Sequence, residues 1–251
     1  MADLLEVLPP RWRQDRMLVG YRTRWDAVEV LGDDDGVLLV AGTDRPLLWG
    51  RGDAAAVDAL VARHARTARW LNLPRDCSPS AETLARLELV PFSTWDWLSL
   101  DTAPPAVPGE DRVRRLDVDA EADAIRACLR VANPGTSAGP QAPGELGWWG
   151  MDDEHGALGG VVGVVERSGP GEDSSWHVHG LGVLPTLRGR GAGSALTAAV
   201  VREAFSAGAP WVSLAMYADN DTARRLYRRL GFRTDVELTS YSPAGADRPP
   251  G

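Results

Sequence analysis

The chain has 251 residues, 44% of them hydrophobic and 25% charged, which are ordinary globular values that exclude a wholly disordered chain or a coiled coil. The 35 acidic and 27 basic residues give a net charge of −8, so neither nucleic acid nor an anionic membrane is an expected partner. The N-terminus has no secretory pattern, and no apolar run approaches the roughly 20 residues of a membrane span. The two cysteines have no metal or redox spacing. We therefore expect a cytoplasmic protein without a metal site.

The first half of the chain contains fewer clear patterns of secondary structure than the second half. An apolar-periodic helix is predicted over 54–68, directly after Gly50-Arg51-Gly52, and a strand over 93–100. Three prolines then mark 101–111 as an extended linker. The predicted organisation is therefore an N-terminal domain over 1–100, a linker over 101–111, a second domain over 112–242 and a disordered tail over 243–251.

The second half predicts alternating strands and helices, with one long functional or mobile loop over 133–147. Its helices show apolar residues at helical spacing, and its strands are short apolar runs bounded by turns. The predicted strands are 112–116, 148–151, 157–165, 176–183, 211–216 and 233–241, and the predicted helices are 120–132, 193–206 and 221–230. The order β-α-β-β-β-α-β-α-β indicates an α/β fold with a mixed sheet.

A weak internal repeat links the two halves. The residue numbers of Gly50 and Gly189 differ by 139, and Phe92 and Phe232 differ by 140. Each of these glycines precedes a predicted helix, and each phenylalanine precedes a predicted strand. The nearly constant offset over more than forty residues favours a duplicated unit, although two α/β segments could share it by chance.

The strongest local signal is a strand that leads through a glycine-rich turn into a helix. Glycine lets the backbone turn sharply and approach an anion, and the first-turn N–H groups of the helix point at that anion. Arg188 and Arg190 add positive charge, so the turn predicts a phosphate or pyrophosphate site, although a tight turn without a ligand fits the same residues. The residues of this turn are Arg188, Gly189, Arg190, Gly191, Ala192, Gly193 and Ser194.

The commoner nucleotide-binding motifs do not fit this turn. A P-loop requires a lysine, and the chain contains none. A dinucleotide-binding fingerprint requires a third glycine where Ser194 stands, and it belongs after the first strand of its fold.

Two linked blocks resemble the GCN5-related N-acetyltransferase (GNAT) superfamily. Arg188, Gly191 and Gly193 match its [Q/R]-x-x-G-x-[G/A] signature. The segment from Asn220 to Phe232, NDTARRLYRRLGF, is similar to its N-x-x-A-x-x-L-Y-x-x-L-G-F block. The resemblance covers about residues 112–242. It implies the mixed-sheet acyl-CoA N-acyltransferase fold, with acetyl-CoA as cosubstrate, no metal, and direct transfer of the acetyl group to an amine.

The resemblance also implies roles for single residues. The strand backbone at Leu181, Gly182 and Val183 would pair with the pantetheine arm, and the amides from Arg188 to Ser194 would hold the pyrophosphate. Asn220 would contact the cofactor, and Tyr227 would protonate the leaving thiolate, since a phenol with a pKa near 10 is protonated at neutral pH. A core aromatic residue on an amphipathic helix is the alternative interpretation of Tyr227.

The sequence does not decide which residue is the general base. His177 stands where many relatives carry a glutamate, and His179 lies two residues on, on the same face of the strand. An imidazole with a pKa near 6.5 can accept a proton from an ammonium group, directly or through water. We favour His177 over His179, with a water chain as the third possibility.

The N-terminal unit lacks the residues that carry the chemistry. At the offset of 139 residues, Trp49 stands in the place of Arg188 and Ala54 in the place of Gly193. At the offset of 140 residues, which aligns Phe92 with Phe232, Leu87 stands in the place of Tyr227. We expect this degenerate unit to have lost coenzyme binding and to support the fold or shape the acceptor site.

The function implied is an acetyl-CoA-dependent N-acetyltransferase that acts on a primary amine of a small molecule or peptide. A coenzyme A-binding sensor or scaffold without turnover is the alternative, and a nucleotide-binding module is a third possibility. The sequence leaves open the acceptor, the base and the oligomeric state.

Overall fold

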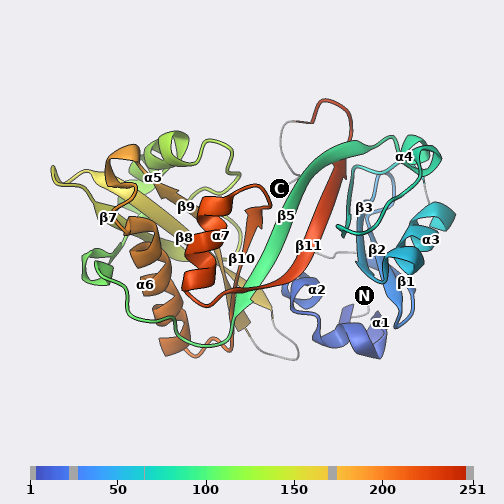
Figure 1. Cartoon of the computed structure of the whole chain (residues 1–251), viewed down its shortest axis with the longest axis horizontal. Coiled ribbons are helices and arrows are strands. Elements are labelled where there is room, and N and C mark those ends of the chain that lie inside the picture. The colour runs from blue at the N-terminus through green and yellow to red at the C-terminus, as the bar shows by residue number, and fades with distance from the viewer. Residues whose placement is uncertain (1–3, 23–27, 65, 169–173, 247–251) are drawn as a thin grey trace.

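One mixed sheet of eleven strands runs through both halves of the computed structural model (Figure 1). The structure describes residues 4–22, 28–64, 66–168 and 174–246. No helix within these residues is long and apolar enough to span a membrane.

The N-terminal half combines short helices with five strands. The helix α3 is described to His64, position 65 lies outside the described residues, and the last predicted helical residue pairs outside the helix instead. Ala68 N–H donates to the Leu87 carbonyl, and Arg69 N–H donates to the Pro46 carbonyl. The elements are α1 (Leu4–Val7), η1 (Pro10–Gln14), α2 (Arg16–Gly20), β1 (Val28–Gly32), β2 (Gly36–Ala41), β3 (Leu47–Gly52), α3 (Ala54–His64), β4 (Trp70–Pro74), α4 (Ala81–Leu87) and β5 (Val90–Leu100).

The C-terminal half has the predicted order of strands and helices. The predicted first strand is shorter than expected, because a 3-10 turn, η3 (Glu110–Arg112), occupies its start and only β6 (Arg114–Arg115) pairs. The predicted long loop ends where β7 begins, at Glu145. The other elements are α5 (Val118–Ala132), β7 (Glu145–Asp152), β8 (Leu158–Ser168), β9 (Ser174–Val183), η4 (Pro185–Leu187), α6 (Ala192–Ser206), β10 (Val212–Tyr217), α7 (Asp221–Arg229) and β11 (Arg233–Ser242).

The two halves exchange their last strands at the centre of the sheet. The strand order is β1-β2-β3-β4-β11-β5-β10-β9-β8-β7-β6. Strand β5, from the N-terminal half, pairs with β10, and β11, from the C-terminal half, pairs with β4; both pairs are antiparallel. Strands β5 and β11 also pair with each other, and they cross the middle of the molecule as two long ribbons (Figure 1). Each half of the sheet is therefore completed by the other half's final strand.

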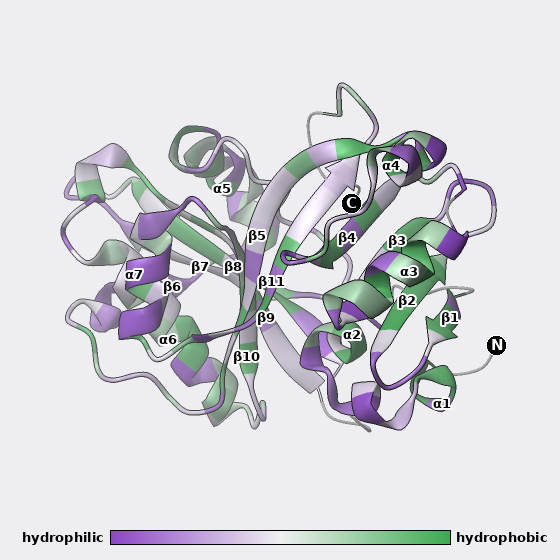
Figure 2. Cartoon of the chain, turned by 45° about the vertical axis from the view of Figure 1, so that its right-hand side comes forward, coloured by the Kyte–Doolittle hydropathy of each residue, from purple (hydrophilic) through white to green (hydrophobic). Residues whose placement is uncertain are grey.

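Helices cover both faces of each half. In the C-terminal half, α6 and α7 pack on one face, in a core that includes Leu98 and Leu100 of β5, and α5 packs on the other face with Trp148. In the N-terminal half, α3 and α4 cover one face, and α1 and α2 cover the other with Trp97 and Trp211. Apolar colour is strong on β2 and β8, whereas the long strands β5 and β11 are mostly pale and α7 is mostly hydrophilic (Figure 2). The exchanged strand β5 thus contributes to the cores of both halves.

Ion pairs and a hydrogen bond hold the proline-rich segment between the two halves against the rest of the protein. Asp101 forms ion pairs with Arg16 and Arg233, each at 2.5 Å. Arg202 of α6 donates to the Pro104 carbonyl at 3.2 Å and pairs with Glu110 at 3.0 Å. Of the tail that was expected to be disordered, the structure describes 243–246, and the rest lies outside the described residues.

Candidate functional site

Strands β9 and β10 separate halfway along their length. Their parallel pairing runs from Trp176 opposite Val212 to Val178 opposite Leu214, and β9 continues for five residues beyond it. On its other side β9 has a register shift against β8, beside Gly180, whose φ of 60° lies in the left-handed region that favours glycine. This irregularity turns β9 away from β10 and opens the sheet edge between them.

The separated end of β9 leads through η4 into the predicted glycine-rich turn. Gly189 and Gly191 have φ values of 74° and 85°, and Gly191 is the N-cap of α6. A Cβ on either glycine would meet nothing within 4 Å, so the space in front of the turn is open. The first-turn amides of an α-helix have no partner inside the helix, and its dipole favours an anion at this end. The geometry is therefore suited to binding a pyrophosphate.

The two arginines of the turn have different positions. Arg188 donates through Nε to the Val183 carbonyl at 2.9 Å and through a terminal nitrogen to the Ala132 carbonyl at 3.1 Å. It thereby fastens the turn to the ends of β9 and α5. Arg190 instead lines a cavity of about 290 Å³ beside the start of α6, together with Arg112 and His155. Arg190 is thus the arginine placed to add positive charge next to the turn.

The strand residues assigned to the pantetheine arm are partly engaged within the protein. The Leu181 carbonyl accepts a hydrogen bond from the Asn133 side chain at 3.1 Å, and the Val183 carbonyl accepts the one from Arg188. Because a carbonyl oxygen has two lone pairs, each can accept a second bond. Gly182, between them, lies against Ala132 and Leu129 of α5. Strand pairing with the pantetheine arm therefore stays a prediction.

Asn220 acts as a helix cap in the structure. Its Oδ1 accepts the Ala223 N–H at 3.0 Å, which satisfies a free amide at the start of α7. The Asn220 side chain is therefore already hydrogen-bonded within the protein, and any contact with a cofactor would be made in addition to that bond.

Tyr227 lies in the core between α7 and the sheet. It is 6% exposed, and its ring packs edge-on against Phe232 with centroids 5.7 Å apart. Burial raises the pKa of Tyr227 to about 12, because the phenolate would lose its hydration. The hydroxyl therefore keeps its proton across the physiological pH range, as a proton donor must.

The two candidate base residues pack against different parts of the protein. His177 is 6% exposed, its Nδ1 lies 2.9 Å from Ser213 Oγ on β10, and its ring faces Tyr21 of the N-terminal half edge-on at 6.3 Å. His179 packs edge-on against Trp148 at 5.2 Å, close to the α5 side. His177 is therefore the one that lies at the junction of the two halves, beside the last paired residues of β9 and β10.

Across the sheet from this site, the N-terminal counterpart of the glycine-rich turn is closed. Asp53 caps α3, because its Oδ1 accepts the amides of Ala55 and Ala56 at 3.0 and 3.1 Å. A Cβ on Gly52 would lie 2.4 Å from the Asp35 carbonyl oxygen, so the β1–β2 turn covers this end. An internal carboxylate thus occupies the helix start that is open in the C-terminal half.

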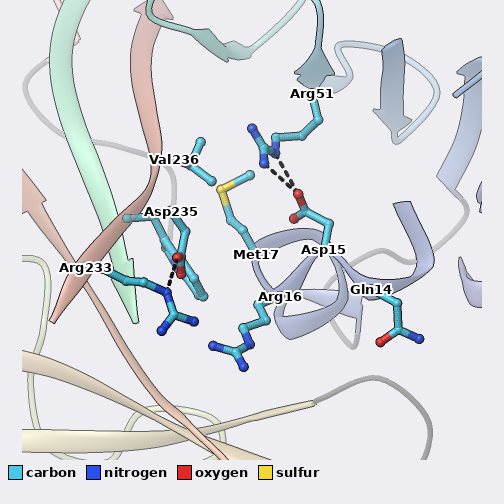
Figure 3. A pocket seen from close by; sticks show the side chains of 9 residues that line it. Gln14, Asp15, Arg16, Met17, Arg51, Arg233, Asp235 and Val236 are labelled. Carbon is cyan, nitrogen blue, oxygen red and sulfur yellow. Dashed lines mark hydrogen bonds and ion pairs between the residues drawn. The ribbon is translucent and has the colours of Figure 1, made fainter. Parts of the chain in front are cut away.

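A second cavity of about 230 Å³ lies under α2, away from the predicted site (Figure 3). Its charged rim is ion-paired within the protein: Arg51 binds Asp15 at 2.6 Å and Arg233 binds Asp235 at 3.3 Å. The remaining lining residues are Gln14, Arg16, Met17, Trp97 and Val236. None of the residues predicted from the sequence lines it.

Ser213 and Asp53 are the site residues that sequence reasoning missed. Ser213 is a single polar residue within the apolar β10, which is a weak signal of a buried hydrogen bond. Asp53 directly precedes the apolar run of α3, as an N-cap residue does, but nothing in the sequence shows that it replaces a ligand.

Residues 122–232 match the family model described as "Acetyltransferase (GNAT) family". Two solved structures share the fold over most of the chain. A GCN5-related N-acetyltransferase from Kribbella flavida has a TM-score of 0.58 at 21% identity, with 95% of this chain and 97% of that chain covered. A putative GNAT acetyltransferase from Novosphingobium aromaticivorans has a TM-score of 0.56 at 20% identity, with 93% and 95% covered.

Residues 122–232 are thus a GNAT acetyltransferase domain, and the chain is an acyltransferase. GNAT acetyltransferases use acetyl-CoA as cosubstrate. Its curated relatives include a protein named mycothiol acetyltransferase from Mycolicibacterium paratuberculosis, 29% identical over 96% of this chain and 97% of that protein. A protein of the same name from Nocardiopsis dassonvillei is 45% identical over 72 residues, which are 29% of this chain and 22% of that protein.

The open glycine-rich turn yields a direct test. In Gly191→Glu the new carboxylate would occupy the place of the pyrophosphate, so the increase in Tm on adding acetyl-CoA is expected to disappear. Thermal unfolding with and without acetyl-CoA measures it.

Gly208→Glu is the matched control for this variant. Gly208 also has a positive φ, of 90°, with nothing within 4 Å of its Cβ, but it follows the other end of α6. Both variants carry the same backbone strain, and Gly208→Glu is expected to keep the full acetyl-CoA shift. Equal shifts in the two variants would show that the anion does not bind at the turn.

Proposed function

We propose that the protein is an N-acetyltransferase that transfers the acetyl group of acetyl-CoA to a primary amine by direct attack. The observation that carries the proposal is the convergence of three parts: the open turn at the start of α6, the separation of β9 from β10, and the buried Tyr227 on α7. A Cβ on Gly193 would lie 3.0 Å from Leu226 and 3.7 Å from Val183, so these three elements come together beside the turn.

In this mechanism the residues of the chain bind, orient and move protons. The turn holds the pyrophosphate, and the open sheet edge directs the thioester toward the interior. The neutral amine nitrogen attacks the thioester carbonyl carbon, a tetrahedral intermediate forms, and the C–S bond breaks. Tyr227 donates its proton to the leaving thiolate, and the ammonium proton of the acceptor passes to the base.

His177 is our first candidate for that base. The Ser213 hydroxyl fixes its ring orientation, and the ring lies where the N-terminal half meets β9 and β10. His179 and a chain of water molecules are the other candidates for the same proton.

The acceptor that we propose to test first is that of the mycothiol acetyltransferases, because a relative of that name aligns over nearly the whole chain. A panel of small-molecule and peptide amines, assayed by thiol release from acetyl-CoA, tests it. Acetyl-CoA binding without thiol release on any acceptor would favour the alternative, a coenzyme A-binding sensor. The cytoplasmic location and the oligomeric state stay predictions.

We also propose that the chain is a tandem pair of GNAT units, with the N-terminal unit degenerate and the boundaries at 1–100 and 112–242. The parallel pairs β3–β4 and β9–β10 occupy equivalent places in the two halves of the sheet order. Ser80 caps α4 as Asn220 caps α7, 140 residues later, and Leu87 takes the place of Tyr227 at the same offset. The exchanged strands β5 and β11 are then the last strands of the two units.

The first prediction from this mechanism concerns the acid. Tyr227→Phe keeps the packing of the ring and removes only the donor, so kcat is expected to fall by roughly 10²-fold with little change in acetyl-CoA affinity. Because burial holds the pKa near 12, the parent enzyme should not lose this acid below a pH of about 10. Steady-state kinetics measure both effects, and an unchanged kcat in Tyr227→Phe would remove Tyr227 from the mechanism.

The second prediction concerns the base. His177→Ala should lower the rate most at acidic to neutral pH, where the acceptor is protonated. The loss should shrink near a pH of about 9–10, as free amine accumulates. A pH–rate profile parallel to that of the parent enzyme would contradict the role of His177, and the same measurement on His179→Ala would then follow.

The third prediction concerns the number of coenzymes. Because Asp53 and the β1–β2 turn close the helix start in the N-terminal half, one acetyl-CoA should bind per chain. Isothermal titration calorimetry gives the stoichiometry. A value near two would show that the N-terminal unit still binds the coenzyme.

A further inference from the structure

A buried carboxylate on the exchanged strand connects the two halves. Asp96 lies on β5, between Met216 of β10 and Glu237 of β11 in the register of the sheet, and it is 0% exposed. One of its oxygens is ion-paired with Arg75, which follows β4, and the other with Arg224 of α7. A carboxylate that is removed from water requires such partners. The buried Asp96 carboxylate therefore holds both arginine side chains in place.

The Arg224 ion pair also fixes the start of α7. Arg224 donates to the carbonyl of Ala218, in the connection between β10 and α7. The Ala218 amide in turn donates to the Thr94 carbonyl of β5 at 2.9 Å. The connection and the first turn of α7 are therefore both bound to β5, a strand that comes from the N-terminal half of the chain.

Helix α7 is short, and its apolar contacts come from three side chains. It spans nine residues; Tyr227 is buried, and Ala223 and Leu226 are partly buried and pack against the same core. Arg224 stands three positions before Tyr227, so the two side chains lie on neighbouring parts of the helix surface. The ring of Tyr227 belongs to the same core as Leu98 and Leu100, which lie two and four positions after Asp96 and so on the same face of β5. The strand thus contacts α7 through one ion pair and one apolar cluster.

We propose that Asp96 and Arg224 are positioning residues, through which the N-terminal half holds α7 so that the Tyr227 hydroxyl reaches the leaving thiolate. The proposal rests on the proposed role of Tyr227. It makes the N-terminal half a necessary part of the catalytic geometry of the C-terminal half, in addition to any part it has in binding the acceptor. A displacement of a catalytic group by about 1 Å can lower the rate by 10²-fold, so a single ion pair can have this effect.

The other arginine on the same carboxylate provides a matched control. Arg75 pairs with Asp96 from the opposite side, and it also binds the Trp95 carbonyl at 3.1 Å and Glu237 at 3.3 Å. None of these partners belongs to α7. Arg75→Met and Arg224→Met therefore each remove one cation from Asp96, but only the second releases the helix that carries Tyr227.

The expected result is a kinetic difference between the two variants. Arg224→Met should lower kcat by about 10- to 100-fold, while the KM for acetyl-CoA changes by less than about threefold, because the turn at α6 is untouched. Arg75→Met should keep kcat within about threefold of the parent, and Arg224→Lys should recover part of the loss by restoring a cation. Thermal unfolding with acetyl-CoA confirms that each variant is folded. Equal losses of kcat in Arg75→Met and Arg224→Met would overturn the proposal, since they would reflect stability alone.

A double-mutant cycle shows whether Arg224 acts through Tyr227. If it does, Arg224→Met should cause little further loss in the Tyr227→Phe background, where the donor is already absent. Independent, multiplicative losses would overturn the positioning role and leave Tyr227 as the acid. Full activity in Tyr227→Phe alone would instead contradict the proposed function at this residue, and the positioning role would fall with it.

Discussion

The exchange of β5 and β11 is the constraint on which the rest of the structure depends. Each strand leaves its own half and completes the sheet of the other, and the two pair with each other at the centre. Since backbone hydrogen bonds on a buried strand must be satisfied, neither half can lose its partner without exposing a row of amides and carbonyls. Side chains on opposite faces of β5 enter the core under α2 and the core under α6 and α7. The halves consequently share one continuous sheet and cannot be treated as independent units.

The N-termini of α3 and α6, the helices that follow β3 and β9, show how one local geometry can serve two purposes. At α6 the glycine-rich turn leaves an open space in front of the free amides, which suits an anion from outside. At α3 the same electrostatic demand is met by the carboxylate of Asp53, which accepts two of those amides. A helix that carries its own carboxylate has less to gain from a phosphate. The Asp53 carboxylate, together with the β1–β2 turn that covers this end, distinguishes the closed helix start from the proposed coenzyme site.

Charge within the fold explains how a hydrophilic helix can hold a defined place. Helix α7 carries several arginines and buries Tyr227, with Ala223 and Leu226 partly buried against the same core. Asp96 contributes a fixed negative charge from β5, and Arg224 brings the helix to it. Removing one partner of a buried pair is costly, because the other charge is left without water or a counterion. The position of Tyr227 is thereby connected to a residue 131 positions earlier in the chain.

The amino-acid sequence by itself determined the local structure of the C-terminal half. Apolar periodicity predicted its helices and strands in order, and the glycines from Gly189 to Gly193 predicted the open turn, because these features depend on neighbours close in the chain. Only the tertiary structure decided which strand lies beside β10, that Asp96 is buried between two arginines, and that His177 faces Tyr21 of the N-terminal half. These contacts join residues far apart in sequence. They follow from the way the two halves pair their strands, and no local pattern of residues encodes that pairing.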